Sequence, residues 1–412
     1  MTETQTNAQN AQGKDVGGCP VFHNDYRLER PVLETWRLLN EDREASRFAW
    51  NDSTTEGFWV LNQFDDVKEA LERNEDFSSE QVSALLRSPT QFLFPNQLNP
   101  PEHGDMRKTL NPFFSPQAVK RISDLARERA IALIEEIKPD GKIDMTQGFA
   151  MLYPTELFLT LLGLPVEDGD MFVPWVEELF VGFFSDTPEA QATMGAAAEK
   201  IGGYFAVAIA EREQNPGDPA TDLVTRLLSA EFRGEPMTQE MILAVCVTLM
   251  AAGLDTTRSV LGFAFHHLAN HPEDRKQLIE EPELWPRAVE ELIRLYSLVF
   301  QDGREVVRDL DFHGVKMKKG DLIWIGLAAA NRDPRKFENP DEFDMFRADL
   351  NHHVGFGAGI HRCLGMHLAR AELVIALEEW HARIPDYRIA EGADLRERGG
   401  QLRLQSLPLE WS

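Results

Sequence analysis

One short segment constrains the fold of this chain more than any other: residues 354–365, which read VGFGAGIHRCLG. Glycines at 355, 357 and 359 fall within five positions, and because they lack Cβ atoms they let the backbone pass close to a flat group. Cys363 ends this loop and directly precedes an Ala- and Leu-rich helical segment. Unpaired N–H groups and the dipole at a helix start favour a thiolate. The segment therefore predicts a sulfur ligand held beside a planar partner.

Three interpretations of Cys363 compete. A lone cysteine is most often a small, inert core residue. Zinc is a second interpretation, suggested by nearby histidines at 352, 353, 361 and 367. Structural zinc sites normally pair Cys or His at short fixed spacing, which one cysteine among scattered histidines does not supply. A thiolate beside a glycine-cleared surface suits a haem iron, to which it donates electron density that favours O–O cleavage.

A second pattern lies at residues 251–257, AAGLDTT, in the middle of a helical pattern that spans 238–269. Asp and Thr are poor helix-interior residues because their side chains compete for backbone hydrogen bonds. Gly253 adds a cost of about 1 kcal/mol relative to Ala. A hydroxyl beside a carboxylate can pass protons to an oxygen species, whereas the structural alternative is a polar kink satisfied by water.

These two segments resemble the cytochrome P450 family. The first matches the FGxGxHxCxG signature, and the second matches the AGxDTT oxygen-groove motif. The resemblance implies a mainly α fold with small β-sheets, a triangular prism-like single large domain. It implies haem b (iron protoporphyrin IX) with Cys363 as the metal ligand and with Phe356 and Gly357 beside the cofactor. It also implies that Thr256 supports bound oxygen and that Asp255 participates in proton delivery.

The resemblance extends to cations for the haem propionates. The segment PPEHGDMR matches PPxHxxxR and assigns His103 and Arg107, while Arg304 and His361 match other family propionate contacts. Two buried carboxylates also need cations beside them, because burying a charge without a partner is energetically costly. Glu291 and Arg294 match the family's ExxR pair and Arg347 its third member, a structural trio.

The likeness is closest to the camphor-hydroxylating branch, which implies a small apolar, terpenoid or norisoprenoid substrate. Two departures make camphor itself doubtful. Gln91 falls near the place of a tyrosine and Thr248 in the place of a leucine. For each apolar candidate, plain core packing is the alternative. The expected substrate-binding residues are Gln91, Leu93, Phe94, Thr248, Ala252, Val299 and Phe300, with Leu402 as a further candidate.

Helical periodicity dominates the chain, and no linker divides it. We expect a flexible tail at 1–18 and one domain at 19–412, with a mobile lid at about 168–213. Irregular stretches at about 80–101 and 331–362 are long enough to be functional. Helices are expected at 35–45, 67–73, 118–137, 147–163, 168–184, 190–213, 238–269, 283–297 and 364–382, and strands at 57–61, 304–312, 321–325 and 402–409.

Composition limits the partners. With 68 acidic against 42 basic residues the formal charge is −26, which disfavours nucleic acid and anionic membranes. Three scattered cysteines form no disulfide framework and fit a reducing cytoplasm. The apolar run 241–254 is shorter than the ~20 residues that span a bilayer, and no signal core precedes it. We therefore expect a cytoplasmic monomer without a membrane anchor.

The chain leaves no room for a fused reductase, so the resemblance implies a separate [2Fe–2S] ferredoxin with its own ferredoxin reductase. An acidic donor could dock on a basic patch behind the cysteine, and scattered surface charge is the alternative. The patch would comprise Lys68, Arg73, Arg107, Lys108 and Arg362. Other functions to weigh are a non-hydroxylating or peroxide-using haem-thiolate enzyme, against which the Asp255–Thr256 pair argues, and a haem-based small-molecule sensor.

Overall fold

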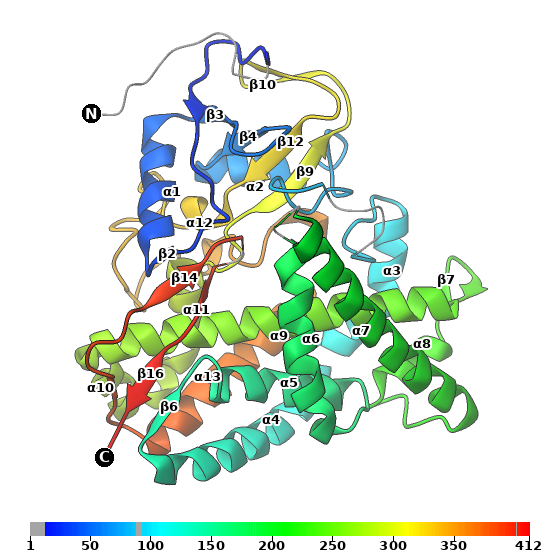
Figure 1. Cartoon of the computed structure of the whole chain (residues 1–412), viewed down its shortest axis with the longest axis vertical. Helices are drawn as coiled ribbons and strands as arrows, with labels where there is room; N and C mark the ends of the chain where they lie inside the picture. The colour runs from blue at the N-terminus through cyan, green and yellow to red at the C-terminus, as the bar shows by residue number, and fades with distance from the viewer. Residues whose placement is uncertain (1–12, 88–92, 184, 186, 401) are drawn as a thin grey trace.

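A computed structural model describes residues 13–87, 93–183, 185, 187–400 and 402–412. Helices fill the larger part of the molecule, and the largest sheet lies at one end (Figure 1). The fold is mainly α with small sheets, as the sequence predicts. Both long irregular stretches contribute to the site, the first through Val82, Ser83, Leu93 and Asn96 and the second through His361.

The largest sheet has six strands in the order β1 (Val21–Phe22), β3 (Phe48–Asn51), β4 (Phe58–Leu61), β12 (Leu322–Ile325), β9 (Asp302–Val306) and β5 (Phe77–Ser78). Strand β12 pairs in parallel with β4 and antiparallel with β9, so that Ile323 lies between Trp59 and Arg304. This register fixes the position of Arg304. The single strand expected at 304–312 is wrong: β9 ends at Val306, and β10 (Leu310–Phe312) forms a separate hairpin with β11 (Val315–Met317).

Helix α9 (Gln239–Asn270) crosses the helical region (Figure 1). It begins where the Thr238 hydroxyl accepts a hydrogen bond from the Met241 N–H at 3.2 Å. The helix packs on α5 (Phe149–Leu161) and α13 (Met366–Arg383), and α13 packs in turn on α4 (Pro116–Ile137). Among the described residues α9 alone has the length and hydropathy of a membrane-spanning helix, and half of its most apolar window is buried. Helices buried on all sides share both properties.

The remaining elements surround this core. The helices are α1 (Glu34–Ala45), α2 (Phe64–Glu72), α3 (Glu102–Leu110), α6 (Gly169–Phe183), α7 (Pro188–Gln214), α8 (Leu223–Leu228), α10 (Pro272–Glu280), α11 (Trp285–Leu295) and α12 (Leu327–Ala330). Smaller sheets are formed by β2 (Arg30–Pro31), β6 (Lys142–Asp144), β7 (Glu231–Phe232), β8 (Glu235–Pro236), β13 (Arg388–Ile389), β14 (Arg396–Arg398), β15 (Arg403–Leu404) and β16 (Pro408–Glu410).

The start of the described chain packs against the sheet region, although the sequence assigns residues 1–18 to a flexible tail. Val16 is only 1% exposed and belongs to a core cluster. Lys14 pairs with Asp321, and its Nζ lies 4.8 Å from the centroid of the Trp50 ring. A buried valine and a charged anchor therefore hold residues 14–16 to the fold.

Candidate active site

The cysteine loop is held by backbone geometry. Gly357 and Gly359 have φ values of 68° and 66°, the left-handed conformation that glycine adopts without strain. A Cβ at position 359 would lie 2.6 Å from the Leu71 carbonyl oxygen at the end of α2, so only glycine fits there. The Cys363 N–H donates to the Phe356 carbonyl at 2.9 Å. These contacts place the sulfur just before α13.

The Cys363 side chain is accessible and makes no disulfide. Surrounding protein nevertheless desolvates the thiol and raises its pKa, while the Gly365 N–H and the cations Arg107, Arg370 and Arg362 lower it. A bound metal ion would favour the thiolate further, because the thiolate and not the thiol is the ligand.

Phe356 is fixed by a charged network behind the loop. The Arg370 guanidinium lies 4.5 Å from the centroid of the Phe356 ring, a cation–π contact. Arg370 Nε donates to Glu290 at 2.6 Å, and His353 Nε2 lies 2.8 Å from the same carboxylate. Burial opposes ionisation of Glu290, yet these hydrogen bonds hold its pKa at about 2. The aromatic ring at the loop's centre is thus clamped by an ionised, buried pair.

Four basic side chains from three elements converge beside the loop. His103 and Arg107 come from α3, Arg304 from β9 and His361 from the loop itself, and the two imidazole centroids are 3.8 Å apart. Burial and the nearby arginines lower the pKa of His103 to about 4 and that of His361 to about 2, so both rings are neutral near pH 7. In the described part of the chain, buried His103 Nδ1, His361 Nε2 and Arg304 Nε have no hydrogen-bond partner.

Arg304 pairs with Asp302 at 2.8 Å, but its Nε and the two imidazole nitrogens still lack a partner among the described residues, and an anion suits this position beside two guanidinium groups. The two carboxylates of a haem match this need, because arginine binds carboxylate strongly and neutral imidazoles donate one hydrogen bond each. Arg107 is engaged on the protein side by the Arg362 carbonyl at 2.9 Å and Asn111 Oδ1 at 3.1 Å, which orients its guanidinium. The residues present therefore fit a haem ligated by Cys363.

Thr256 and Asp255 point to different surroundings although they are adjacent on α9. Thr256 lines a cavity, and its Oγ1 donates to the Ala252 carbonyl at 2.6 Å. Asp255 is buried behind the helix and is not among the cavity-lining residues. Its Oδ1 accepts from Arg403 Nη1 at 2.6 Å, and Arg403 Nη2 donates to Glu177 on α6 at 2.7 Å. The carboxylate is thus linked through one arginine to the helix that covers the cavity.

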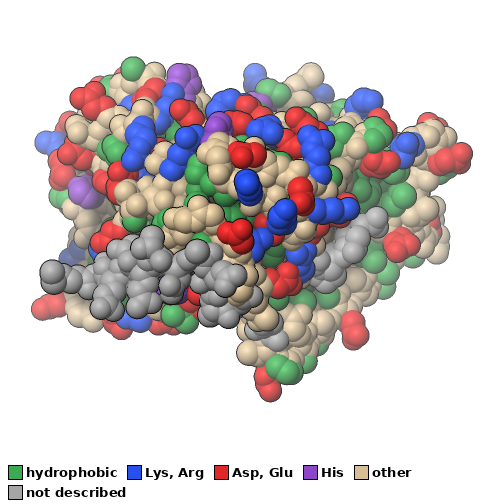
Figure 2. Space-filling view, turned by 90° about the horizontal axis from the view of Figure 1, so that it is seen from above, with side chains coloured by type: hydrophobic (Ala, Val, Ile, Leu, Met, Phe, Trp, Pro, Cys, Tyr) green, Lys and Arg blue, Asp and Glu red, His purple; other side chains and the backbone are tan. Residues whose placement is uncertain are grey.

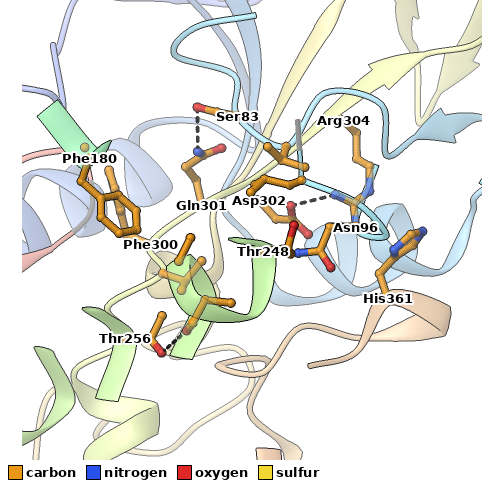
Figure 3. A pocket seen from close by; sticks show the side chains of 16 residues that line it. Ser83, Asn96, Phe180, Thr248, Thr256, Phe300, Gln301, Asp302, Arg304 and His361 are labelled. Atoms are coloured by element: carbon orange, nitrogen blue, oxygen red, sulfur yellow. Dashed lines mark hydrogen bonds and ion pairs between the residues drawn. The ribbon is translucent and has the colours of Figure 1, made fainter. Parts of the chain in front are cut away.

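The cavity has a volume of about 230 Å³ (Figure 3). Figure 3 places Arg304 and His361 at one end, and Phe180 and Phe300 toward the other. Near its middle the Thr248 side chain is 3% exposed, and its Oγ1 has no hydrogen-bond partner among the described residues. The lining residues are Val82, Ser83, Leu93, Asn96, Phe180, Thr248, Ala251, Ala252, Thr256, Val299, Phe300, Gln301, Asp302, Arg304, His361 and Gly400.

The expected substrate residues divide into three groups. The cavity is lined by Leu93, Thr248, Ala252, Val299 and Phe300. Phe94 instead packs in the helical core, its ring centroid 6.3 Å from that of Phe232, and Leu402 is fully buried with its N–H bonded to the Leu298 carbonyl. Gln91 lies outside the described residues. The sequence pattern therefore predicts which segments line the cavity but not the direction in which each side chain points.

Sequence reasoning missed the polar corner of this cavity. Gln301 Nε2 donates to Ser83 Oγ at 3.1 Å, and Gln301 Oε1 accepts from the Ala84 N–H at 3.4 Å. Between Gln301 and Arg304, the Gly303 N–H donates to the Val82 carbonyl at 3.0 Å. A Cβ at position 303 would overlap the Ser83 backbone. The glycine within DGR was the only available signal of this close approach.

Glu372 on α13 is a second omission. It is buried next to α9, where the Thr257 hydroxyl donates to its Oε2 at 3.4 Å. Burial raises the pKa of this carboxyl to about 8, so it is largely protonated at neutral pH. In the sequence, an acidic residue within an Ala- and Leu-rich helix looks like an ordinary surface position.

The expected structural trio forms as the sequence predicts. Arg294 makes a bidentate pair with Glu291 at 2.7 and 2.8 Å, and both side chains are 0% exposed. Arg347 Nε lies 3.4 Å from the same carboxylate. Arg294 also donates to the Asn331 and Pro340 carbonyls at 2.7 Å, which ties α11 to the long segment before the cysteine loop.

The basic patch expected behind the cysteine is largely neutralised. Lys68 pairs with Glu72 at 2.6 Å, Arg73 with Glu69 at 2.8 Å, and Lys108 with Asp105 at 2.9 Å. Arg362 is exposed, and no carboxylate among the described residues pairs with it. The same mixing of charge signs covers the end of the molecule shown in Figure 2.

Comparisons with known proteins agree with this geometry. The sequence model of the cytochrome P450 family matches residues 48–380. The probable cytochrome P450 127A1 of Sinorhizobium fredii is 35% identical over 86% of this chain and 84% of that protein. The vitamin D(3) 25-hydroxylase of Pseudonocardia autotrophica is 32% identical over 82% of this chain and 83% of that protein. The crystal structure of CYP101J2 superposes with a TM-score of 0.86 over 100% of both chains, at 29% identity.

Proposed function

This chain belongs to the cytochrome P450 family of haem b monooxygenases, and from that premise we propose that it hydroxylates a small terpenoid or norisoprenoid carrying one polar oxygen. The observation that carries the proposal is the cavity between Thr256 and Phe300. Away from Arg304 and His361, which would meet the haem propionates, its lining includes Ala251, Ala252, Val299 and Phe300 beside Thr248, and this mainly apolar surface favours a small apolar substrate.

Thr248 is the reason to expect a polar oxygen on the substrate. The Thr248 hydroxyl is buried, lies on the α9 side of the cavity with Ala251 and Ala252, and has no partner in the described chain, whereas Thr256 satisfies its own hydroxyl on the preceding helical turn. A buried hydroxyl without a partner costs about 1–3 kcal/mol. A ketone, ether or hydroxyl oxygen of the substrate would remove this cost and orient the hydrocarbon skeleton.

The relatives alone do not select this substrate. They include a vitamin D(3) 25-hydroxylase and a polyketide biosynthesis cytochrome P450, whose substrates, as those names state, are chemically diverse. The substrate class therefore rests on the residues of this cavity.

The chain's own residues have distinct proposed roles. Cys363 would hold the iron, Phe356 and Gly357 would lie beside the ring, and the propionates would take the donors of His103, Arg107, Arg304 and His361. Bound haem supplies the activation of oxygen and its transfer to carbon. Thr256 holds a hydroxyl proton inside the cavity, next to the wall that binds the substrate.

Asp255 would supply protons to Thr256 from behind α9. In the structure its carboxylate is paired with Arg403, so proton delivery requires the side chain to exchange that partner for the Thr256 side of the helix. Because Arg403 also holds Glu177 on α6, this exchange would accompany movement of the helices that cover the cavity. The Asp255–Thr256 pair thereby favours oxygen-dependent hydroxylation over peroxide use.

Electrons would come from a separate [2Fe–2S] ferredoxin and its reductase in the cytoplasm. Arg362 is adjacent to the cysteine, exposed and without a carboxylate partner among the described residues, so it is available to an acidic donor. Its neighbours' ion pairs are solvent-exposed, and such pairs contribute only about 0–1 kcal/mol, so a docking protein could exchange them.

A ligand screen on the ferric holoprotein tests the proposal. Matched terpenoids with and without one ketone or hydroxyl would be titrated while the spin-state shift of the haem spectrum is recorded. We expect the oxygenated member to bind about tenfold more tightly and to be hydroxylated when NAD(P)H, reductase, ferredoxin and O2 are supplied. Equal binding of all pairs would refute the role of Thr248. Tight binding without any turnover would instead support a sensor.

A further inference from the structure

Far from the cavity, three side chains capable of binding a metal meet where α9 ends and α10 begins. His267 lies in the last turn of α9, His271 follows its final residue, and Asp274 lies in the first turn of α10. One ligand atom from each lies within 4.8 Å of the other two. No other three His, Cys, Asp or Glu side chains in the described ranges form such a group.

Chain geometry holds this cluster together. Histidines four residues apart share one helix face, and their ring centroids are 4.3 Å apart. Pro272 starts α10 directly after His271, which brings Asp274 back over the helix end. As a result His267 Nε2 lies 3.1 Å from Asp274 Oδ2, a separation that suits two ligands of one ion.

Neighbouring groups orient both imidazoles. His267 Nδ1 lies 2.9 Å from the Tyr296 hydroxyl at the end of α11, and His271 Nδ1 lies 3.3 Å from Glu273 Oε1. Metal-binding histidines usually have their second ring nitrogen engaged in this way, which fixes the tautomer and raises ligand basicity.

We propose that His267, His271 and Asp274 form a binding site for one divalent transition-metal ion of the zinc type. Two nitrogens and one carboxylate oxygen are ligands that zinc accepts, and water would complete a tetrahedral shell. On binding, the His267 proton would move from Nε2, which faces Asp274, to Nδ1, where it would be donated to the Tyr296 hydroxyl. The ion would join α9, α10 and, through Tyr296, α11.

The site is independent of the haem chemistry. His267 is eleven residues beyond Thr256 on the same helix, about 16 Å at 1.5 Å per residue. The ion would therefore stabilise the helix junction without contacting the substrate, and its binding can be measured on the resting protein without turnover.

Calorimetric titration of zinc into chelator-treated ferric holoprotein tests the site, with Cys19→Ser as the background because Cys19 is a partly exposed thiol. We expect one saturable equivalent and a raised Tm. Asp274→Asn and His271→Ala should each weaken zinc binding at least tenfold, and Tyr296→Phe, which keeps the ring, about tenfold. An unchanged haem spectrum would establish that each variant is folded.

His23→Ala is the matched control. His23 lies 2.6 Å from Asp52 but belongs to no three-residue group of this kind among the described residues, so zinc binding should be unchanged. Absence of saturable binding would overturn the proposal, as would a tight equivalent that survives both Asp274→Asn and His271→Ala. Neither result would bear on the substrate, because no turnover is involved.

Discussion

The two walls of the active site, the cysteine wall formed by residues 354–365 and the substrate wall formed by the cavity-lining side chains, are built on different principles. The cysteine wall is fixed by left-handed glycines, backbone hydrogen bonds and buried ion pairs such as Glu290–Arg370. The substrate wall consists mainly of apolar side chains, and Val299 there is 37% exposed. Directional bonds allow one arrangement of a wall, whereas apolar packing tolerates many. This difference suits an enzyme that must hold its cofactor in one position and can accept different substrates.

The largest effect of a substitution is expected on the cysteine wall, where Cys363 supplies the sulfur ligand. Cys363→Ala should abolish monooxygenation and the thiolate-type absorption band of the reduced carbon-monoxide complex, because no other described side chain replaces this ligand. Product formation and that spectrum measure the effect. Cys246→Ser, at a buried cysteine outside the loop, is the control and should keep the band. A normal band in the alanine variant would contradict the assignment of Cys363.

Next in size is the buried trio behind the cysteine wall. Arg294→Met leaves Glu291 charged and buried, which should lower the free energy of unfolding by about 3–5 kcal/mol and reduce haem retention. Denaturant titration measures this loss. Arg37→Met, which breaks exposed pairs with Glu34 and Glu41 on α1, should lower the free energy of unfolding far less, because solvent screens exposed ion pairs. Equal losses in the two variants would show that burial of the trio is unimportant.

Glu372 gives the cysteine side a pH-dependent stability. Its pKa is raised from 4.5 to about 8 in the folded protein, so its contribution is fully present below about pH 4.5 and is lost as the pH rises through 8. At about 1.4 kcal/mol per pKa unit, the change from 4.5 to about 8 corresponds to a total loss of about 5 kcal/mol. Glu372→Gln should flatten the stability profile between pH 5 and 8, measured by denaturant unfolding. A parallel profile in wild type and variant would exclude Glu372 as the cause.

Thr256 lies on the substrate wall and holds the hydroxyl assigned to proton transfer. Thr256→Ala should lower product formed per NAD(P)H oxidised by about 10²-fold, the scale of lost proton transfer, while ligand affinity stays unchanged. Product analysis alongside oxygen consumption measures this coupling. Thr256→Ser keeps the hydroxyl and should retain most of it. A large change in ligand affinity would assign Thr256 to substrate binding instead.

The smallest expected effect is on the substrate wall. Thr248→Val preserves side-chain shape and removes the hydroxyl, so oxygenated terpenoids should bind about tenfold more weakly, equivalent to about 1.4 kcal/mol. Their hydrocarbon analogues should bind equally well or better. Spin-state titrations of matched pairs measure both. Equal weakening of both members of a pair would point to altered packing rather than a lost hydrogen bond.

The same difference explains what the sequence could predict. Cys363, Thr256 and the donors at His103 and Arg304 lie in short motifs whose spacing carries the chemistry. The long helices α4 and α9 were predicted to within a few residues for a similar reason, because each has a long regular pattern of apolar residues.

Side-chain direction in the irregular stretch at 80–101 depends instead on distant elements. Phe94 faces the helical core, where its ring packs edge-to-face on Phe232. Ser83 faces the cavity, where its hydroxyl accepts a hydrogen bond from Gln301. Burial of Glu372 likewise depends on packing between α9 and α13. Local patterns contain none of these contacts.

Position 303 has a consequence for altering substrate range. Because the Ser83 backbone occupies the space that any β-carbon there would need, a mutant library that randomises this position would consist mostly of misfolded clones. Diversity is better placed at 248, 299 and 300, whose side chains border the cavity. Strand β9 would then keep its position, and new specificities would arise from changed side chains on the neighbouring elements.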